Sequence, residues 1–201
     1  GETFDIHCGG VDNMFPHHEN EIAQSEAATG KKFVNYWLHN EHLLVEGKRM
    51  AKRFGNFYTL RDLLKMGYDP KTIRYLLLST QYRQQFNFTF EGFDAAKGAI
   101  ERLRNLMRRL LDANGKSSGE ESTQLMNKLQ TSFGEAMDDD LNISIALAAL
   151  FDFVRYINNL LDANALSRDG AKQVLALIAS FDKVLGVIGE AEKEETLPKE
   201  A

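Results

Sequence analysis

The second half of the chain has the hydrophobic spacing of long amphipathic helices. From Phe93 onward, apolar residues recur every three or four positions and so share one helix face: Ile100, Leu103, Leu106, Met107, Leu110 and Leu111. The same spacing predicts further helices over about 122–137, from a cap at Asn142 past Asn158, and over about 167–187. Residues 114–119 form a polar, glycine-containing linker. This half is predicted to be an antiparallel helical bundle.

The first half alternates between strand-like and helical segments. Phe4–His7 reads as a short strand, and Pro16 to about Ala28 has helical composition with Gly30 as its stop. Phe33–Val45 is rich in aromatic and branched residues, which favours strands, and we expect a pair that turns near residues 40–41.

A polar, basic loop follows at 46–56. Thr59 is then placed to cap a short helix, and Asp69-Pro70 to begin another. The predicted fold class is therefore mixed α/β followed by all-α, and mainly helical.

Composition narrows the class of protein. The 201 residues are 43% hydrophobic, and the single cysteine excludes an intrachain disulfide framework. We find no signal-peptide pattern and expect no apolar run long enough to cross a membrane, so a cytosolic protein is predicted. The net charge of −5 conceals a basic middle: 48–109 has 14 Lys and Arg against 5 Asp and Glu. This stretch could meet a phosphate backbone, although charge alone favours the interpretation as solvated helix faces.

All five histidines and the cysteine lie in the first 42 residues. His17 and Glu21 would stand one helical turn apart and could hold one metal ion, although such a pair is more often a salt link or a cap. His7 and Cys8 alternate on a strand, so both are not expected to bind the same ion.

Two further segments suggest nucleotide chemistry. Gly9-Gly10-x-Asp12 lies between a strand and a helix, where glycine lets a nucleotide approach and an acid can accept from ribose hydroxyls; a tight turn alone would also need glycine. The basic loop 48–56 could neutralise charge on a leaving pyrophosphate, or could be a solvated loop or an RNA contact. Trp37 is interpreted as core.

These residues are part of a longer pattern. The run FDIHxGGxDxxFPHHENEIAQS, from Phe4 to Ser25, resembles the second half of the catalytic domain of cysteinyl-tRNA synthetases. The resemblance continues in order through VNYWLH, GNFxTLRDL, IRYxLL, Tyr82-Arg83 and AMDDDLN, and so covers nearly the whole chain.

The resemblance implies a domain organisation. Residues 1–56 would end the Rossmann-like catalytic domain of a class I synthetase and include its signature loop at 49–53. Residues 57–115 would form a connecting fold, 120–189 the helical bundle of the tRNA-binding region, and 190–201 an acidic tail. We expect the chain to be the C-terminal part of a longer cysteine–tRNA ligase.

It also implies an activity and its site. Such an enzyme, usually a monomer, activates cysteine with ATP and Mg²⁺ and transfers it to tRNA-Cys, with one zinc ion per full-length subunit binding the substrate thiol. His17 and Glu21 match two of the four protein ligands of zinc, and His7 matches a histidine beside the bound cysteine. Gly9 and Asp12 match the ATP-side turn, while Arg49 and Lys52 occupy the catalytic Lys-Met-Ser-Lys-Ser loop, where Lys52 would contact ATP.

Three departures limit this expectation. The family's two cysteine ligands and its His-Ile-Gly-His-type ATP motif lie upstream of Gly1, and Cys8 stands where the family usually has a third glycine. The signature loop reads Arg49-Met-Ala-Lys-Arg53, and arginine is not equivalent to lysine at a phosphate. We therefore expect the chain alone not to activate cysteine. Two alternatives are a related cysteine:amino-sugar ligase and a non-catalytic tRNA-binding paralogue.

Overall fold

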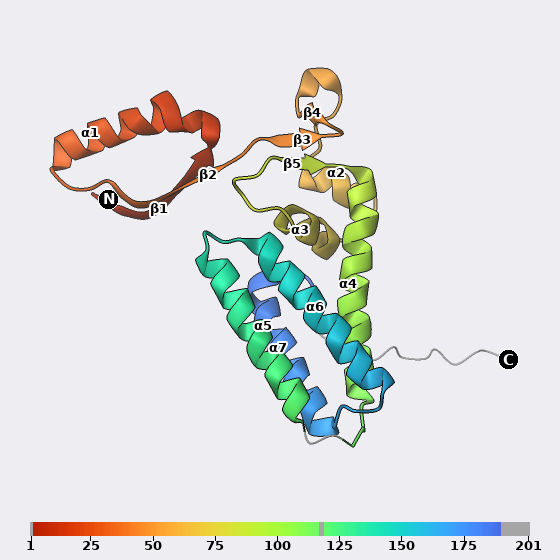
Figure 1. Cartoon of the computed structure of the whole chain (residues 1–201). Coiled ribbons are helices and arrows are strands. Elements are labelled where there is room, and N and C mark those ends of the chain that lie inside the picture. Colours follow the sequence, from red (N-terminus) through yellow and green to blue (C-terminus); the bar gives the residue numbers. More distant parts are fainter. Residues whose placement is uncertain (1, 117–118, 190–201) are drawn as a thin grey trace. The chain divides into compact units, whose positions relative to one another are not determined.

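The computed structural model describes residues 2–116 and 119–189 (Figure 1). The predicted acidic tail and two residues of the predicted linker lie outside this range. The chain forms two compact units, each built from two stretches of sequence: unit 1 comprises Gly1–Thr59 and Thr80–Phe90, and unit 2 comprises Leu60–Ser79 and Glu91–Ala201. The domain division expected from the sequence, at 1–56, 57–115 and 120–189, stays a prediction. The fold class is confirmed as α/β followed by all-α, with helices predominating.

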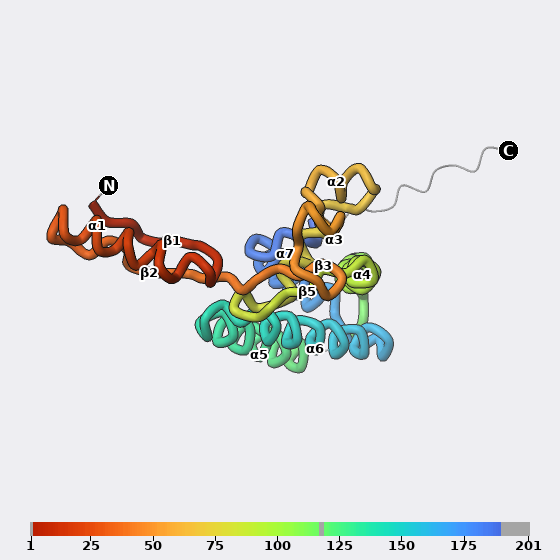
Figure 2. Tube along the Cα trace, turned by 90° about the horizontal axis from the view of Figure 1, so that it is seen from above, coloured from red at the N-terminus to blue at the C-terminus, as the bar shows by residue number. Residues whose placement is uncertain are grey.

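Unit 1 begins with a β-α-β arrangement. Strand β1 (Phe4–Gly10) pairs in parallel with β2 (Val34–Asn40), and helix α1 (Glu19–Thr29) connects them. Figure 2 shows α1 lying along the two strands. Gly30 ends α1 with a left-handed φ of 64°, which confirms the predicted helix stop at this glycine. The crossover helix returns the chain to the start of β1, which is why the two strands run parallel.

A second, three-stranded sheet completes unit 1. Its order is β4 (Lys48–Arg49), β3 (Leu43–Val45) and β5 (Phe86–Phe88). The expected strand pair that turns near residues 40–41 is therefore wrong, because β2 pairs with β1 while β3 pairs antiparallel with β4 and parallel with β5. The predicted basic loop contains β4 and a single 3₁₀ turn at Lys52–Phe54.

Helix α1 begins later than Pro16. A 3₁₀ turn at Val11–Asn13 and an irregular helical turn at Met14–His18 precede it, and Phe15 is extended (φ −136°, ψ 131°). Proline disfavours helical backbone at the residue before it, so the chain straightens at Phe15. The Phe15–Pro16 peptide bond is cis. This irregular turn sets the direction of the side chains at 17 and 18.

Unit 2 is helical. Its elements are α2 (Leu60–Lys65), α3 (Pro70–Leu78), α4 (Phe90–Leu111), α5 (Glu120–Asp138), α6 (Ile143–Asp162) and α7 (Arg168–Leu185). Asp69 caps α3 by accepting from Thr72 N–H at 2.9 Å, with Pro70 as the first helical residue, as predicted. Asn142 caps α6 as predicted, accepting from Ile145 N–H at 3.4 Å.

Helices α4, α5, α6 and α7 share one apolar core. The stripe predicted on α4 is buried from Ile100 to Leu110, whereas Leu111, in the last turn, is 41% exposed and does not belong to the core. Helix α6 contributes a fully buried stripe that includes Leu150 and Ile157. The bundle prediction is confirmed in its helices and its core.

Helix α6 corrects one expectation. Among the described residues it is the one helix long and apolar enough, by length and composition, to cross a membrane. Its apolar character has a local cause, since its buried stripe packs against the other bundle helices, α5 above all.

Candidate functional site

A cluster of histidines lies between β1, β2 and the start of α1. Strand β1 carries His7, which is the register partner of Trp37 on β2. His39 is two residues further along β2 and therefore shares the face of Trp37. The turn into α1 supplies His17, His18 and Glu21. Side chains from three elements thus meet at one place in unit 1.

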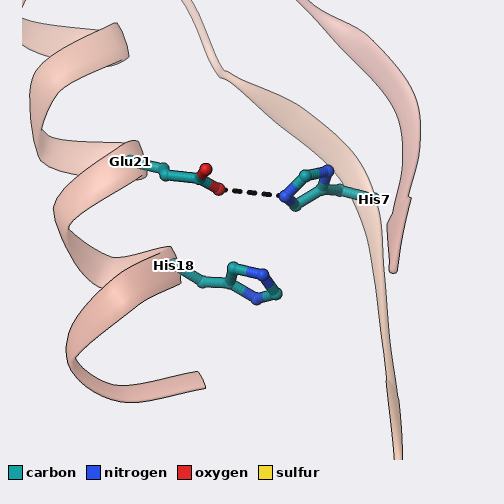
Figure 3. A group of neighbouring side chains, drawn as sticks. All are labelled: His7, His18 and Glu21. Carbon is teal, nitrogen blue, oxygen red and sulfur yellow. Dashed lines mark hydrogen bonds and ion pairs between the residues drawn. The ribbon is translucent and has the colours of Figure 1, made fainter. Parts of the chain in front are cut away.

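Glu21 links two of these histidines. Its Oε2 lies 2.9 Å from His7 Nε2, and its Oε1 lies 3.4 Å from His17 Nε2 (Figure 3 shows the first contact). The side chain of His17 is 64% exposed, against 31% for Glu21 and 28% for His7. The predicted one-turn proximity of His17 and Glu21 is therefore observed, with His17 facing solvent and His7 on the inner side of the carboxylate.

His18 is the buried member of the cluster. It is 4% exposed, and its Nδ1 lies 2.8 Å from His39 Nε2. Its ring centroid is 4.8 Å from that of His7 and 4.9 Å from that of Trp37. Burial, reinforced by the neighbouring imidazoles of His39 and His7, lowers the pKa of His18. Its environment therefore favours the neutral form of the imidazole.

Gly9 is required by this packing. A Cβ built at Gly9 would lie 2.6 Å from His18 Cε1 and 3.1 Å from its Nε2. The absence of a side chain at this position therefore admits the His18 ring. Gly9 and Gly10 end β1, and Asp12 is exposed in the 3₁₀ turn that follows. This is the carboxyl end of a parallel strand, where open α/β sheets bind ligands.

The basic loop is held by one asparagine. Asn56 Oδ1 accepts from Ala51 N–H at 2.9 Å, and Asn56 Nδ2 donates to Arg49 C=O at 3.2 Å. Arg49 and Lys52 are exposed, and Lys52 Nζ lies 5.6 Å from the centroid of Phe57. In the described part of the chain, neither cation has a hydrogen bond or ion pair with the histidine cluster. The structure therefore brings together His7, His17 and Glu21, with Gly9 beside them, but not the loop cations.

Three members of the cluster are not predicted as site residues from the sequence: His18, Trp37 and His39. Trp37 was interpreted as core, yet it is only half-buried and stacks on His39 with ring planes 2° apart. The alternation of Trp37 and His39 on one strand face was the available signal. No local signal marks His18 as buried beside an exposed His17, because that difference arises from the irregular turn before α1.

The residues present fit a zinc ion in part. Zinc bonds to imidazole nitrogen and carboxylate oxygen of about 2.0–2.2 Å imply donor atoms about 3.4 Å apart in a tetrahedral site. The His17 Nε2–Glu21 Oε1 separation of 3.4 Å has this length. His7 against the other carboxylate oxygen resembles the outer partners that orient metal ligands. Two donors are thus in place, and a tetrahedral site needs two more.

Comparison with known proteins gives the family. Residues 1–98 match the family described as "tRNA synthetases class I (C) catalytic domain", and residues 132–189 match the DALR domain. Cysteine–tRNA ligase of Protochlamydia amoebophila is 53% identical over 98% of this chain and 41% of its own length. The enzyme of the same name from Chlamydia muridarum is 48% identical over 94% of this chain and 42% of its own. The chain thus spans about two fifths of the length of the curated relatives it matches.

Solved structures agree on the fold. LeuRS of Agrobacterium radiobacter, in a ternary complex with tRNA and LeuAMS, superposes with a TM-score of 0.70 at 18% identity, over 92% of this chain and 26% of that one. Methionyl-tRNA synthetase of Mycobacterium tuberculosis, bound by methionyl-adenylate, gives a TM-score of 0.65 at 17% identity, over 79% and 34%. These structures show the fold, and the two family matches with the identity of about 50% to curated relatives show that the chain belongs to the cysteinyl-tRNA synthetases, a family of class I aminoacyl-tRNA synthetases.

Proposed function

We propose that this chain supplies part of the cysteine site and the tRNA-facing helices of a cytosolic, monomeric cysteine–tRNA ligase. This enzyme activates cysteine with ATP and Mg²⁺ and transfers it to tRNA-Cys. The observation that carries the proposal is the arrangement of Glu21 between His17 (3.4 Å) and His7 (2.9 Å), in a chain about 50% identical to cysteine–tRNA ligases.

In this proposal His17 and Glu21 hold zinc together with two cysteine thiolates that precede the first residue in the family pattern. Zinc, when bound, would coordinate the substrate thiolate, a much better ligand than the hydroxyl of serine, and so would discriminate between the two amino acids. His7 orients Glu21 by donating from Nε2 to Oε2. The exposed part of the His7 ring lies beside the bound cysteine.

The ATP side would be formed by residues from both sheets of unit 1. Gly9 and Asp12, at the carboxyl end of β1, suit the nucleotide, with the Asp12 carboxylate accepting from ribose hydroxyls. The Lys52 ammonium and Arg49 guanidinium would neutralise the charge that develops on pyrophosphate. Their exposure leaves both free to reach a ligand.

The organisation expected from the sequence completes the proposal. Residues 1–56 would belong to the catalytic domain, 57–115 to a connecting fold, and 120–189 to the tRNA-binding bundle. The basic stretch 48–109 would contact the tRNA backbone through Lys and Arg side chains.

A chimera tests the function. This chain replaces the matching segment of the Protochlamydia relative, and cysteine-dependent ATP–pyrophosphate exchange is measured. We expect exchange from the chimera and none from the 201-residue chain alone. His17→Ala and Glu21→Gln should lower the exchange rate at least tenfold, whereas Glu19→Gln, an exposed carboxylate on the same helix, should leave it unchanged. A folded chimera with no exchange would contradict the proposal.

One observation favours a second function. The loop sequence Arg49-Met-Ala-Lys-Arg53 differs from the family signature at three positions while remaining basic. A non-catalytic tRNA-binding protein would need only this charge. A chimera that binds tRNA-Cys with undiminished affinity but catalyses no exchange would support this second function.

A further inference from the structure

We propose that Asn56 is a positioning residue, which holds the basic loop in the conformation that presents the Lys52 ammonium to a ligand. The inference rests on the proposed function, in which Lys52 neutralises the charge that develops on pyrophosphate. Asn56 is uncharged and acts only through the backbone of the loop. The residues that carry the inference all lie in unit 1.

The side-chain amide of Asn56 matches its partners atom by atom. Its Oδ1 accepts from Ala51 N–H at 2.9 Å, while its Nδ2 donates to the carbonyl oxygens of Arg49 at 3.2 Å and Val45 at 3.5 Å. An amide offers an acceptor and a donor on one planar group, which neither a carboxylate nor an alkyl side chain provides. The side chain therefore joins the loop to the last residues of β3 and β4.

The same amide closes a compact turn. Phe54 N–H donates to Ala51 C=O at 3.0 Å, and Gly55 N–H donates to Lys52 C=O at 3.1 Å. Gly55 has a left-handed φ of 67°, a conformation that glycine adopts without strain, and it brings the chain back on itself. The four residues of the turn between Ala51 and Asn56 are exposed, whereas Asn56 is half-buried. The amide is therefore the anchor of an otherwise exposed loop.

Lys52 depends on this anchor more than Arg49 does. Arg49 is the register partner of Leu44 in the pairing of β4 with β3, so the sheet fixes its backbone. Lys52 lies beyond the end of β4, and its Nζ is 5.6 Å from the ring centroid of Phe57, within the range of a cation–π contact. Because Phe57 directly follows Asn56, the anchor fixes both the backbone before Lys52 and the ring beside its ammonium.

A fixed ammonium stabilises a transition state better than a mobile one. A charge that is already in place where negative charge develops needs no reorganisation during the reaction. A displacement of about 1 Å can lower a rate about 100-fold. Loss of the Asn56 amide would release the loop that carries Lys52, whereas the histidine cluster is formed by other elements of unit 1. We therefore expect a lower kcat with an unchanged KM for cysteine.

The first test measures the anchor in the 201-residue chain itself, by hydrogen exchange of backbone amides. Asn56→Ala should speed the exchange of Ala51 N–H about tenfold or more and leave that of Gly47 N–H unchanged. Asn87→Ala is the matched control, because Asn87 Oδ1 accepts from Gly47 N–H at 2.8 Å in the turn between β3 and β4. It should have the opposite pattern. Unchanged exchange of Ala51 N–H in Asn56→Ala would overturn the proposal.

The second test measures cysteine-dependent ATP–pyrophosphate exchange by the chimera. Asn56→Ala should lower kcat about tenfold or more and change the KM for cysteine less than about twofold, whereas Asn87→Ala should leave both unchanged. Asn56→Asp should not restore the rate, because a carboxylate keeps the acceptor for Ala51 N–H but turns an oxygen toward the Arg49 carbonyl.

A double-mutant cycle separates positioning from a general structural effect. In a Lys52→Ala background, Asn56→Ala should have no further effect on kcat, because Asn56 acts through Lys52. The same loss in both backgrounds would overturn the positioning role.

The outcomes also distinguish this inference from the proposed function. A chimera that catalyses exchange with undiminished kcat in Asn56→Ala overturns the positioning role and leaves the function intact. A folded chimera without any exchange overturns the function and, with it, the role of Asn56 in the reaction.

Discussion

Substitution of Gly9 by alanine tests the packing of the histidine cluster. The added methyl group would lie 2.6 Å from His18 Cε1 and 3.3 Å from Asn13 Nδ2. Carbon atoms in contact are normally about 3.5–4.0 Å apart, so the His18 ring must shift by about 1 Å. The ring is not free to do so, because Nδ1 is bound to His39 and its faces meet His7 and Trp37.

The cost follows from this constraint. Overpacking a filled site costs about 1–3 kcal/mol, and breaking the hydrogen bond of a buried polar group costs about as much. These are alternative responses to one clash, so they are not added. We expect Gly9→Ala to lower the free energy of unfolding of unit 1 by about 1–3 kcal/mol.

Trp37 makes the effect measurable in unit 1 alone. It is the single tryptophan, and its ring lies 4.9 Å from that of His18, whereas the far-ultraviolet circular dichroism is dominated by the helices of unit 2. With a urea dependence of about 1–3 kcal/mol per molar for a small folded unit, the fluorescence midpoint should fall by roughly 1 M. The circular dichroism transition should stay in place.

Gly134→Ala is the matched control. Gly134 lies inside α5, and a Cβ there meets nothing within 4 Å. The substitution should raise the stability of unit 2 by about 0.5–1 kcal/mol, because alanine is the better helix former. An unchanged fluorescence midpoint in Gly9→Ala would refute the inferred packing of His18 against Gly9.

Three further predictions concern unit 2. Leu150→Ala, at a fully buried core position, should cost about 2–5 kcal/mol in urea unfolding followed by circular dichroism, while Ile145→Ala on the exposed face of the same helix should cost under about 0.5 kcal/mol. Asp182→Ala should lower the free energy of unfolding by about 1–3 kcal/mol in the same assay, because the carboxylate accepts from three backbone N–H groups at 187–189, at 2.8–3.0 Å. An unchanged free energy of unfolding would show that water fully replaces the carboxylate. Burial raises the pKa of Tyr75, so its phenol ionises more readily in the unfolded chain than in the folded one. The contribution of the neutral, buried phenol to the free energy of unfolding is therefore present below pH 10 and is lost as the pH rises above that value. Thermal midpoints measured from pH 8 to 11 should therefore fall more steeply for the unmodified chain than for Tyr75→Phe, and parallel curves would contradict this.

Local rules predicted much of the helical half. The cap at Asn142, the Asp69-Pro70 helix start and the stripe from Ile100 to Leu110 follow from interactions within a few residues, and the structure contains all three. Leu111 is exposed because the helix ends there, and periodicity alone does not show where the covering neighbours stop.

Strand partners were harder to predict because two paired strands can lie far apart in the sequence. Leu43–Val45 is close to β2 in sequence, but it pairs with β5, about 43 residues further along the chain. Composition identifies a strand without identifying its neighbour. The division of parallel and antiparallel pairs among β1 to β5 therefore came only from the structure.

The site shows the same limit at the level of single residues. The one-turn spacing of His17 and Glu21 was predictable, whereas the burial of His18 depends on the extended Phe15 before Pro16. The contact of His7 with Glu21 joins residues 14 positions apart and needs β1 to lie along α1. The roles of Arg49 and Lys52 stay predictions.

The most direct test of the central proposal is the attachment of radiolabelled cysteine to tRNA-Cys by the chimera, with the intact Protochlamydia enzyme measured in parallel. Our account predicts that the chimera charges the tRNA with cysteine and not with serine, and that His17→Ala lowers this charging at least tenfold. A folded chimera that leaves tRNA-Cys uncharged, under conditions in which the intact relative charges it, would contradict the account.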